Sequence, residues 1–362
     1  MQNIDNKKYL SETIGVLRFP LMVCIVFLHI YIPYKSDHLF VSFYDKYIVE
    51  SIARLAVPLF FFISGFLFFN KVDCYDFLEY KSKLKTRFMR LFVPYILWGL
   101  FVVGIRYVCY LFGQSDNINL FVEGSRWLYH VILFPINYQL WFVRDLFIVA
   151  LLSPIVYYLL KRLNYFFVVG LGIVWLCYHN NFFVLFDLED FVSSKTILKP
   201  AGYDFVSLFF FSFGAWFAIF NRDFTLLFKS CFPIAIVPYL FFAIYRFIVD
   251  DIFLSEFCHR LAILSGMVFF VVIVYLLLKS GKVKRNLFLE NGGQMIYYYH
   301  TIFLTYFVGV LKMLHVFEID NSFVYSLVYF SVPVVTILLG LGLYKVGEKR
   351  CPKVMNFVLG LK

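Results

Sequence analysis

Long apolar segments alternate with short polar ones along almost the whole chain. Ten of them are candidate membrane-spanning helices: 14–34, 48–70, 91–112, 140–160, 164–179, 205–220, 231–249, 257–278, 294–314 and 322–345. A helix needs about 20 apolar residues to cross the hydrocarbon core of a bilayer. The pattern predicts an all-α integral membrane protein, a bundle of about ten transmembrane helices that forms a single domain over residues 1–362. A shorter apolar stretch, 127–136, is predicted to be re-entrant or interfacial.

The composition supports a membrane environment. Hydrophobic residues make up 62% of the chain and charged residues 15%, whereas soluble domains are roughly 45–50% apolar and about 25% charged. Mean hydropathy is +0.80. The chain therefore lacks the charges to cover a water-facing surface, which excludes a soluble enzyme, a disordered protein and a nucleic-acid-binding domain. The seven cysteines show no spacing typical of a metal site or a disulfide framework.

The positive charges are unevenly distributed over the predicted loops. With the N-terminus in the cytoplasm, 21 of the 33 Lys and Arg residues fall on the cytoplasmic side, 6 on the outer side and 6 within spans. Cytoplasmic loops of membrane proteins are enriched in Lys and Arg. The bias predicts a multi-pass protein of the inner or plasma membrane, surrounded by membrane lipids, with both termini cytoplasmic. The first span has no small-residue cleavage site, so it is predicted to be a retained anchor.

Ionisable residues within spans are costly and become functional candidates by default. In the first span Arg18 and His29 lie 11 positions apart, about 16.5 Å along one helix face. A histidine can take a proton from a hydroxyl near neutral pH, so His29 is a candidate general base, with Arg18 near the cytoplasmic boundary. The alternative is structural: Arg18 reaches the membrane surface as a topology anchor, and His29 hydrogen-bonds to a neighbouring helix.

The second span and the segment after it carry two further patterns. Ser64-Gly65 allows a neighbouring helix backbone to approach closely. The predicted cytoplasmic loop 71–90 then supplies five cations within ten residues, namely Lys81, Lys83, Lys85, Arg87 and Arg90. Guanidinium groups match phosphate oxygens, so this loop is a candidate phosphate site. Topology control and attraction to anionic lipid headgroups are the alternative explanation.

The fourth and ninth spans contain the remaining candidates. Arg144 and Asp145 follow Trp141 at a depth comparable with that of His29. Asp145 could orient an imidazolium, and Arg144, or else Arg54 of the second span, could stabilise an oxyanion. A local ion pair is the alternative. For His300, in the ninth span, a structural hydrogen bond is the preferred interpretation.

Taken in order, these motifs resemble the acyltransferase 3 family of integral-membrane O-acyltransferases. The resemblance is carried by Arg18 with His29, the run Val57–Phe66, Pro94-Tyr95, Leu140-Trp141 with Arg144-Asp145-Leu146, and a Tyr-rich segment ending in His300. One departure is Gln139, where the family often has histidine.

The resemblance implies a ten-helix bundle that takes an acyl group, usually acetyl, from cytoplasmic acetyl-CoA or another acyl-CoA and passes it to a hydroxyl of a cell-surface glycan. It assigns His29, Arg18, Asp145 and Arg144 to catalysis. The acyl-CoA site is assigned to Lys83, Lys85, Arg87, Arg90, Tyr95 and Ser64, and no metal is implied.

Two other functions fit parts of the pattern. A transporter or flippase of a glycan or lipid intermediate would also use buried arginines, although the later half of the chain holds no second copy of the early motifs, as inverted repeats would require. A structural membrane protein without activity is the other. The sequence leaves open the acceptor, the length of the acyl group, the face that receives it, direct or acyl-enzyme transfer, and the choice between monomer and homodimer.

Overall fold

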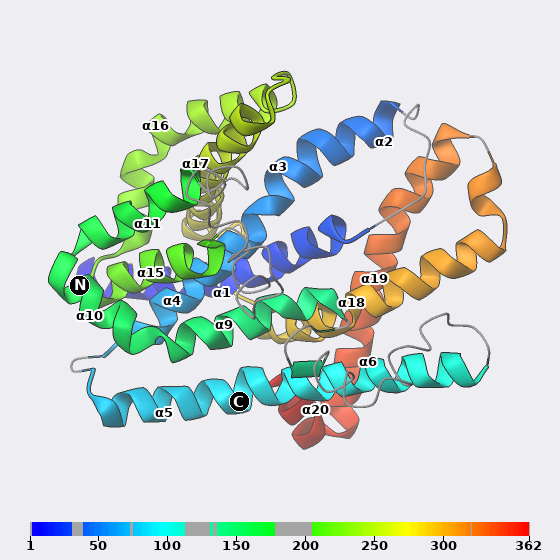
Figure 1. The fold of residues 1–362 in the computed structure, drawn as a ribbon, viewed down its shortest axis with the longest axis horizontal. Helices are drawn as coiled ribbons and strands as arrows, with labels where there is room; N and C mark the ends of the chain where they lie inside the picture. The colour runs from blue at the N-terminus through cyan, green and yellow to red at the C-terminus, as the bar shows by residue number, and fades with distance from the viewer. Residues whose placement is uncertain are drawn as a thin grey trace, which may run out of the picture.

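The computed structural model describes residues 2–30, 39–72, 75–112, 131–132, 135, 137–177, 205–319 and 321–361. Within these ranges the regular structure is entirely helical (Figure 1). The first half of the chain forms α1 (Gln2–Leu28), α2 (Leu39–Tyr44), η1 (Asp45–Val49), α3 (Glu50–Ile52), η2 (Ala53–Leu55), α4 (Ala56–Phe69), α5 (Phe77–Arg87), η3 (Phe88–Phe92), α6 (Val93–Leu111), η4 (Tyr138–Leu140), α9 (Trp141–Leu151), α10 (Ser153–Leu163) and α11 (Tyr165–Cys177). The second half forms α15 (Val206–Ile219), α16 (Phe224–Tyr245), α17 (Ile252–Lys279), α18 (Leu287–Met313), η6 (Val316–Glu318), α19 (Ser322–Arg350) and α20 (Pro352–Leu359).

Each of the ten predicted spans coincides with helical structure, which confirms the all-α class. In the described part of the chain, six helical segments are long and apolar enough to cross a membrane: Lys8–Leu28, Leu39–Phe69, Phe77–Leu111, Phe224–Tyr245, Ile252–Lys279 and Ser322–Arg350. A seventh arises if Tyr138–Leu151 and Ser153–Leu163, bent by 60°, cross as one. The helices α11 and α15 are shorter, and α18 has 27 residues but is less apolar. The count of about ten spans and the cytoplasmic position of the termini therefore stay predictions.

Two segments differ from their predicted boundaries. The first helix begins at Gln2 and ends at Leu28, so Arg18 lies inside the helix and His29 just beyond its last residue. The polar N-terminal residues continue the helix because nothing in 2–13 breaks it. The predicted basic loop is also largely helical, since α5 starts at Phe77, where the side chain of Asp76 caps it by accepting from the backbone N–H of Glu79 at 2.8 Å. The stretch 127–136 lies almost wholly outside the described residues.

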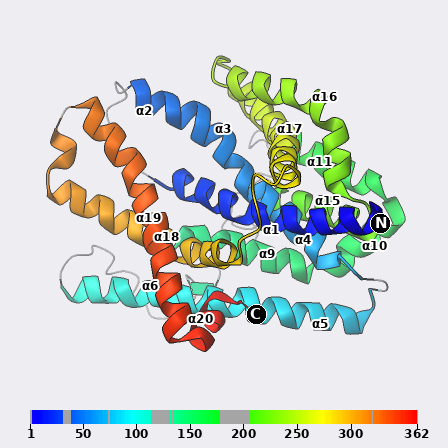
Figure 2. The ribbon, with the colours of Figure 1, turned by 180° about the vertical axis from the view of Figure 1, so that it is seen from behind.

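Helix α1 runs through the middle of the molecule (Figures 1 and 2). It packs against α4, α17, α18 and α19. Leu17, Leu21 and Val26 on α1 are fully buried in these contacts. Because helices that contact so many neighbours move little, α1 is a rigid support for the polar side chains it carries.

Helices α4 and α15 cross at a close approach of two glycines. A Cβ added to Gly65 would overlap the carbonyl group of Phe211, and one added to Gly214 would overlap that of Phe62. The prediction that Ser64-Gly65 allows a close backbone approach is thus confirmed.

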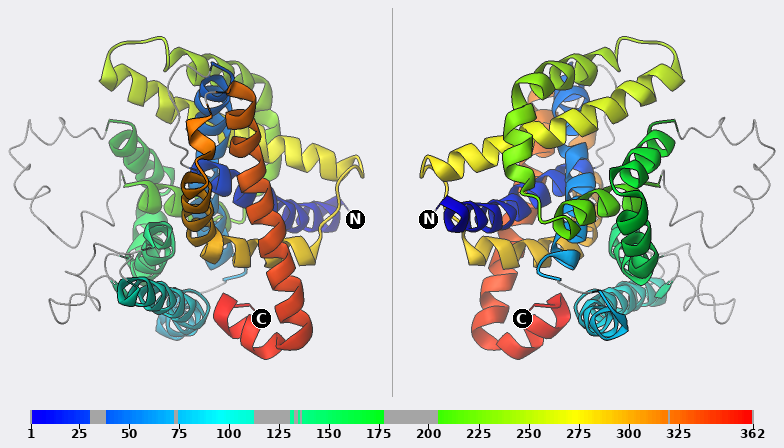
Figure 3. Two further views of the ribbon diagram at one scale, coloured as in Figure 1. Left: turned by 90° about the vertical axis from the view of Figure 1, so that its right-hand side faces the viewer. Right: turned by 90° about the vertical axis from the view of Figure 1, so that its left-hand side faces the viewer.

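The long helix formed by α5, η3 and α6 lies along one side, where the C-terminal helix α20 packs against it (Figure 1). Trp98 donates to the carbonyl of Val358 at 3.1 Å. Gly360, at φ +66°, lies against the carbonyl of Arg90, so a side chain there would be strained twice over. Figure 3 shows α16 and α17 at the opposite end of the molecule from α20.

Candidate functional site

Two polar pairs join α1 to α18. Arg18 Nη1 lies 2.5 Å from Glu290 Oε1, and His29 Nδ1 lies 3.2 Å from His300 Nε2. The members of the pairs are 11 residues apart on α1 and 10 apart on α18, about 15–16.5 Å in a helix. Helices joined at two places with the same order and almost the same spacing run parallel and in register. The two ends of this helix pair define the two ends of the site.

The hydrogen bonds of the histidine pair assign its protons. The Nδ1 atom of His300 lies 3.0 Å from the carbonyl oxygen of Ile296 and 2.8 Å from that of Tyr297, and His29 Nδ1 lies 2.8 Å from that of Ile25. A carbonyl oxygen only accepts hydrogen bonds, so both imidazoles carry their proton on Nδ1 when neutral. His300 Nε2 then accepts from His29.

This arrangement leaves one lone pair of His29 available. No described residue forms a hydrogen bond with His29 Nε2, which is the basic nitrogen of the neutral ring in this tautomer. His300 is completely buried, and its own proton is committed to the α18 backbone. The pair therefore fixes the orientation of the His29 ring and makes Nε2 the nitrogen that can accept a proton.

The segment that begins α9 packs beside the histidine pair. The ring of Tyr138 lies 5.2 Å from that of His29, centroid to centroid. Tyr297 donates to the carbonyl of Gln139 at 2.6 Å. The side-chain amide of Gln139 is 2% exposed, and neither its oxygen nor its nitrogen has a hydrogen-bond partner among the described residues. Sequence reasoning singled out this position only as a departure from the family pattern.

The buried pair Arg144 and Asp145 lies on α9. Arg144 Nη2 donates to Asp145 Oδ1 at 2.7 Å and Nε donates to the same oxygen at 2.9 Å. Asp145 forms no hydrogen bond with His29, whose ring is oriented by His300 instead. The ion pair between Arg144 and Asp145 is thus formed by neighbouring residues of α9.

Arginines gather at the other end of the helix pair. Arg285 Nε donates to Glu290 Oε2 at 2.8 Å, so Glu290 holds both Arg18 and Arg285. Hydrogen bonds to Glu290 raise the pKa of Arg285, in the segment between α17 and α18, above its ordinary value. Arg87 lies close enough to Arg18 for their charges to interact. Gly15 makes room here, since a Cβ at that position would overlap the Arg285 side chain. This arginine cluster (Arg18, Arg87 and Arg285) carries three positive charges, which exceed the two negative charges of Glu290 and of Glu12, the second carboxylate near Arg285.

The other residues assigned to acyl-CoA lie on neighbouring surfaces. The cationic groups of Lys83 and Arg87 lie 5.9 and 5.5 Å from the ring centroid of Phe68, one turn after Ser64 on α4. Lys85 is exposed, and Arg90 lies beside Gly360. Tyr95 is buried and donates to the carbonyl of Ile132 at 2.8 Å. Of the basic segment, only Arg87 therefore reaches the arginine cluster.

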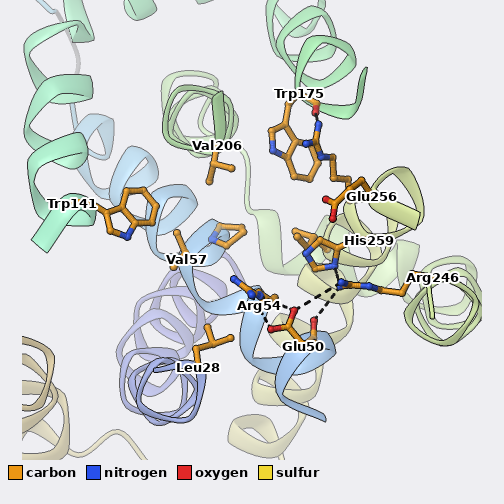
Figure 4. A pocket seen from close by; sticks show the side chains of 13 residues that line it. Leu28, Glu50, Arg54, Val57, Trp141, Trp175, Val206, Arg246, Glu256 and His259 are labelled. Carbon is orange, nitrogen blue, oxygen red and sulfur yellow. Dashed lines mark hydrogen bonds and ion pairs between the residues drawn. The ribbon is translucent and has the colours of Figure 1, made fainter. Parts of the chain in front are cut away.

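A pocket of about 320 Å³ opens next to the histidine end (Figure 4). Its lining is Leu28, Glu50, Arg54, Val57, Pro58, Trp141, Trp175, Val206, Arg246, Glu256, His259, Arg260 and Ile263. Leu28 directly precedes His29, while Val57, Pro58 and Trp141 belong to the motifs that carry the family resemblance. The pocket thus reaches the end of α1 at Leu28, next to His29 in the chain, although neither histidine of the pair belongs to its lining.

Several charged side chains of the pocket contact one another. Arg54 makes a bidentate contact with Glu50, at 2.9 and 2.8 Å. Arg246 Nη2 lies 3.9 Å from the same carboxylate, and Arg246 also contacts His259 Nδ1. Arg260 donates to the carbonyl of Trp175. Figure 4 shows these groups on one side of the pocket, at the ends of α16 and α17 and on α3 and η2.

Three elements of this site were absent from the sequence-based prediction. They are the orienting role of His300, the partner Glu290, and the grouping of Glu50, Glu256 and His259 with Arg246 and Arg260, two arginines that the sequence indicates only as ionisable residues within spans. Each depends on contacts between helices far apart in the chain, such as the 272 positions that separate Arg18 from Glu290. Spacing along one helix indicates which side chains share a face, but not which helix that face meets.

Comparisons with known proteins agree with the motif pattern. The family model described as an acyltransferase domain, Acyl_transf_3, matches residues 12–345. The succinoglycan biosynthesis protein ExoH of Rhizobium meliloti (strain 1021) is 32% identical over 165 residues. That match covers 42% of this chain and 44% of the relative, so less than half of the relative's length is spanned. No solved structure matches the chain. The family match confirms the resemblance drawn from the motifs.

Proposed function

Since this chain belongs to the acyltransferase 3 family, we propose that it transfers an acyl group, in the first place acetyl, from acyl-CoA to a hydroxyl of a cell-surface glycan. The observation that carries the proposal is the His29–His300 pair, which leaves His29 Nε2 without a hydrogen bond from any described residue; the preceding residue, Leu28, lines a pocket. The similarity to a protein named for succinoglycan biosynthesis supports an acceptor of the glycan class.

In the proposed reaction His29 acts as general base. Its Nε2 takes the proton of the acceptor hydroxyl while the hydroxyl oxygen attacks the thioester carbonyl. The tetrahedral intermediate carries a negative oxygen. Arg54, which lines the pocket together with Leu28, the residue before His29, is the arginine proposed to stabilise it. Collapse of the intermediate breaks the C–S bond, and the thiolate of CoA recovers the proton from the His29 imidazolium. Direct transfer of this kind needs no acyl-enzyme.

The donor is proposed to enter at the arginine end. Arg18, Arg87 and Arg285 provide three positive charges against the two negative charges of Glu290 and Glu12. Guanidinium groups form paired hydrogen bonds with phosphate oxygens, which suits the phosphates of CoA. The thioester would then extend along α1 from Arg18 toward His29, about 16.5 Å away. Arg144 and Asp145 are proposed to fix the start of α9 at the histidine end.

The test replaces His29 by alanine and follows transfer of radiolabelled acetyl from acetyl-CoA to glycan in membranes. General-base assistance typically contributes about 10²–10⁴-fold, so His29→Ala should reduce transfer by at least about 10²-fold while the protein is still made and inserted. The matched control is His315→Ala, because His315 is exposed and pairs only with Glu318 at the far end of α18. Normal acetylation by His29→Ala would contradict the assignment. A wild-type protein that moves glycan across vesicles without acylating it would support the transporter instead.

A further inference from the structure

The pocket beside His29 carries more positive than negative charge. Arg54, Arg246 and Arg260 face the two carboxylates of Glu50 and Glu256. His259 adds no charge, since its Nδ1 contacts a guanidinium and must accept the hydrogen bond. Among the described lining residues, the positive charges therefore exceed the negative ones by one.

Two of these arginines keep hydrogen-bonding capacity that their partners do not use. The Arg246 side chain is 11% exposed. Its Nε atom is buried and has no hydrogen-bond partner among the described residues. Arg54 uses Nε and one terminal nitrogen on Glu50, and half of its side chain remains exposed at 49%. Glu50 holds both guanidinium groups in place, so their remaining N–H groups are oriented before any ligand arrives.

Aromatic and apolar side chains form the rest of the wall. Trp141 and Trp175 lie on either side of Val206 in Figure 4, across the pocket from Glu50. Trp175 is almost fully buried and is fixed by its carbonyl contact with Arg260. Apolar faces on one side and guanidinium groups on the other suit a small ring that bears an anionic group.

We propose that this pocket binds a carboxylate on the acceptor sugar, so that the enzyme selects an acidic glycan and presents one of its hydroxyls to His29. The proposal rests on the proposed function for the reaction that follows binding. The arginine pair supplies the planar donors that a carboxylate accepts. The phosphates of CoA are assigned elsewhere, because the arginine cluster around Arg18, three turns before His29, lies about 16.5 Å away along α1.

The experiment compares two small acceptors that differ in one group. The methyl glycoside of glucuronic acid carries a carboxylate at neutral pH, and the methyl glycoside of glucose carries a neutral hydroxymethyl in its place. Binding of each to the purified full-length chain in nanodiscs is measured by calorimetry without acyl-CoA, and acetyl transfer is measured separately with acetyl-CoA. The wild-type protein should bind the glucuronide about tenfold or more tightly than the glucoside, and added salt should reduce the difference.

Two variants are expected to change glucuronide binding in opposite directions. Arg246→Gln should weaken glucuronide binding and raise its KM by about tenfold, with little change for the glucoside or in the KM for acetyl-CoA. Glu256→Gln removes a negative charge that acts on Arg246 and should tighten glucuronide binding. A general loss of structure would instead weaken glucuronide binding in both variants. The matched control is Lys229→Gln, an exposed cation near the start of the helix that ends beside Arg246.

The outcomes separate this proposal from the proposed function. Glucuronide binding without any acetyl transfer would support the pocket and contradict the transferase. Acetyl transfer with equal binding of the two glycosides would overturn the pocket proposal alone. An increase in the KM for acetyl-CoA in Arg246→Gln, with glucuronide binding unchanged, would also overturn it, since the pocket would then serve the donor.

Discussion

At the scale of single residues, the chemistry of His29 depends on where one proton resides. The carbonyl of Ile25 and the Nε2 atom of His300 both lie near His29 Nδ1, at 2.8 and 3.2 Å. Both act as acceptors, so together they hold the proton on Nδ1 and leave Nε2 basic. In this respect His300 does for His29 what a carboxylate does in hydrolase triads, without bringing a negative charge into the membrane.

His300 is thus a positioning residue, and its replacement should affect turnover more than binding. His300→Leu removes the acceptor, and kcat is expected to fall by about 10²-fold with the KM for acyl-CoA unchanged. His300→Gln offers an amide oxygen to His29 and should recover part of the loss. Steady-state kinetics of both variants provide the measurement. Equal activity in the leucine and glutamine variants would show that only the volume of His300 matters.

The arginines near the site should separate into a catalytic and a structural group. Arg54→Gln is expected to lower kcat by about 10²–10³-fold, the loss typical of one oxyanion donor. Arg144→Gln leaves the carboxylate of Asp145, which is 1% exposed, without its counter-ion and should cost about 3–5 kcal/mol of stability. Thermal unfolding and kinetics, measured on both variants, test the distinction. Arg144→Gln with normal stability and greatly reduced kcat would reverse the two roles.

At the scale of elements, the site depends on a few close helix contacts. The crossing of α4 and α15 brings the Val57-Pro58 wall of the pocket next to α15, because two glycines let the backbones meet. The sequence motif Ser64-Gly65 indicated half of this contact. Its partner Gly214 could not be identified in advance, since many glycines in membrane helices contact nothing and no spacing rule links positions about 150 residues apart.

A methyl group at this crossing should therefore destabilise the protein. Gly214→Ala places a Cβ against the carbonyl of Phe62, which no side-chain rotation can relieve, and overpacking of this kind costs about 1–3 kcal/mol. Gly104→Ala on α6 is the control, since nothing lies within 4 Å of the added Cβ, and alanine favours a helix. Melting temperatures in detergent should fall only for the first variant. Equal melting temperatures would place the close approach in doubt.

At the scale of the whole molecule, the apolar pattern predicted the class and the positions of the helices well. Every predicted span overlaps a helix, because apolar segments about 20 residues long leave few alternatives in a bilayer. Boundaries were less accurate where polar residues continue a helix, as at the start of the first span and in the basic segment around Lys83. The pairing of Arg18 with Glu290 and the pocket around Arg246 arise from tertiary packing, which periodicity does not encode.

The parallel arrangement of α1 and α18 makes a prediction about topology. The segment before α18 and the N-terminus should lie on one face of the membrane, and the end of α18 on the other. In a variant whose seven cysteines are replaced by serine, Lys282→Cys and His315→Cys should react with a membrane-impermeant thiol reagent from opposite faces. A tag at the N-terminus should be accessible from the same face as Lys282→Cys. Labelling of both cysteines from one face would contradict the arrangement.

The two pairs that join α1 to α18 also bear on how the membrane insulates the cell. They lie about 15–16.5 Å apart along their helices, roughly half the thickness of a hydrocarbon core of about 30 Å. The donor site proposed between them would leave only the other half of the barrier to hold back protons and ions. Glu290, clamped between Arg18 and Arg285, closes one end with charge, and the neutral histidine pair closes the other without it. The side chains at these four positions must therefore limit proton leakage as well as support the rate of transfer.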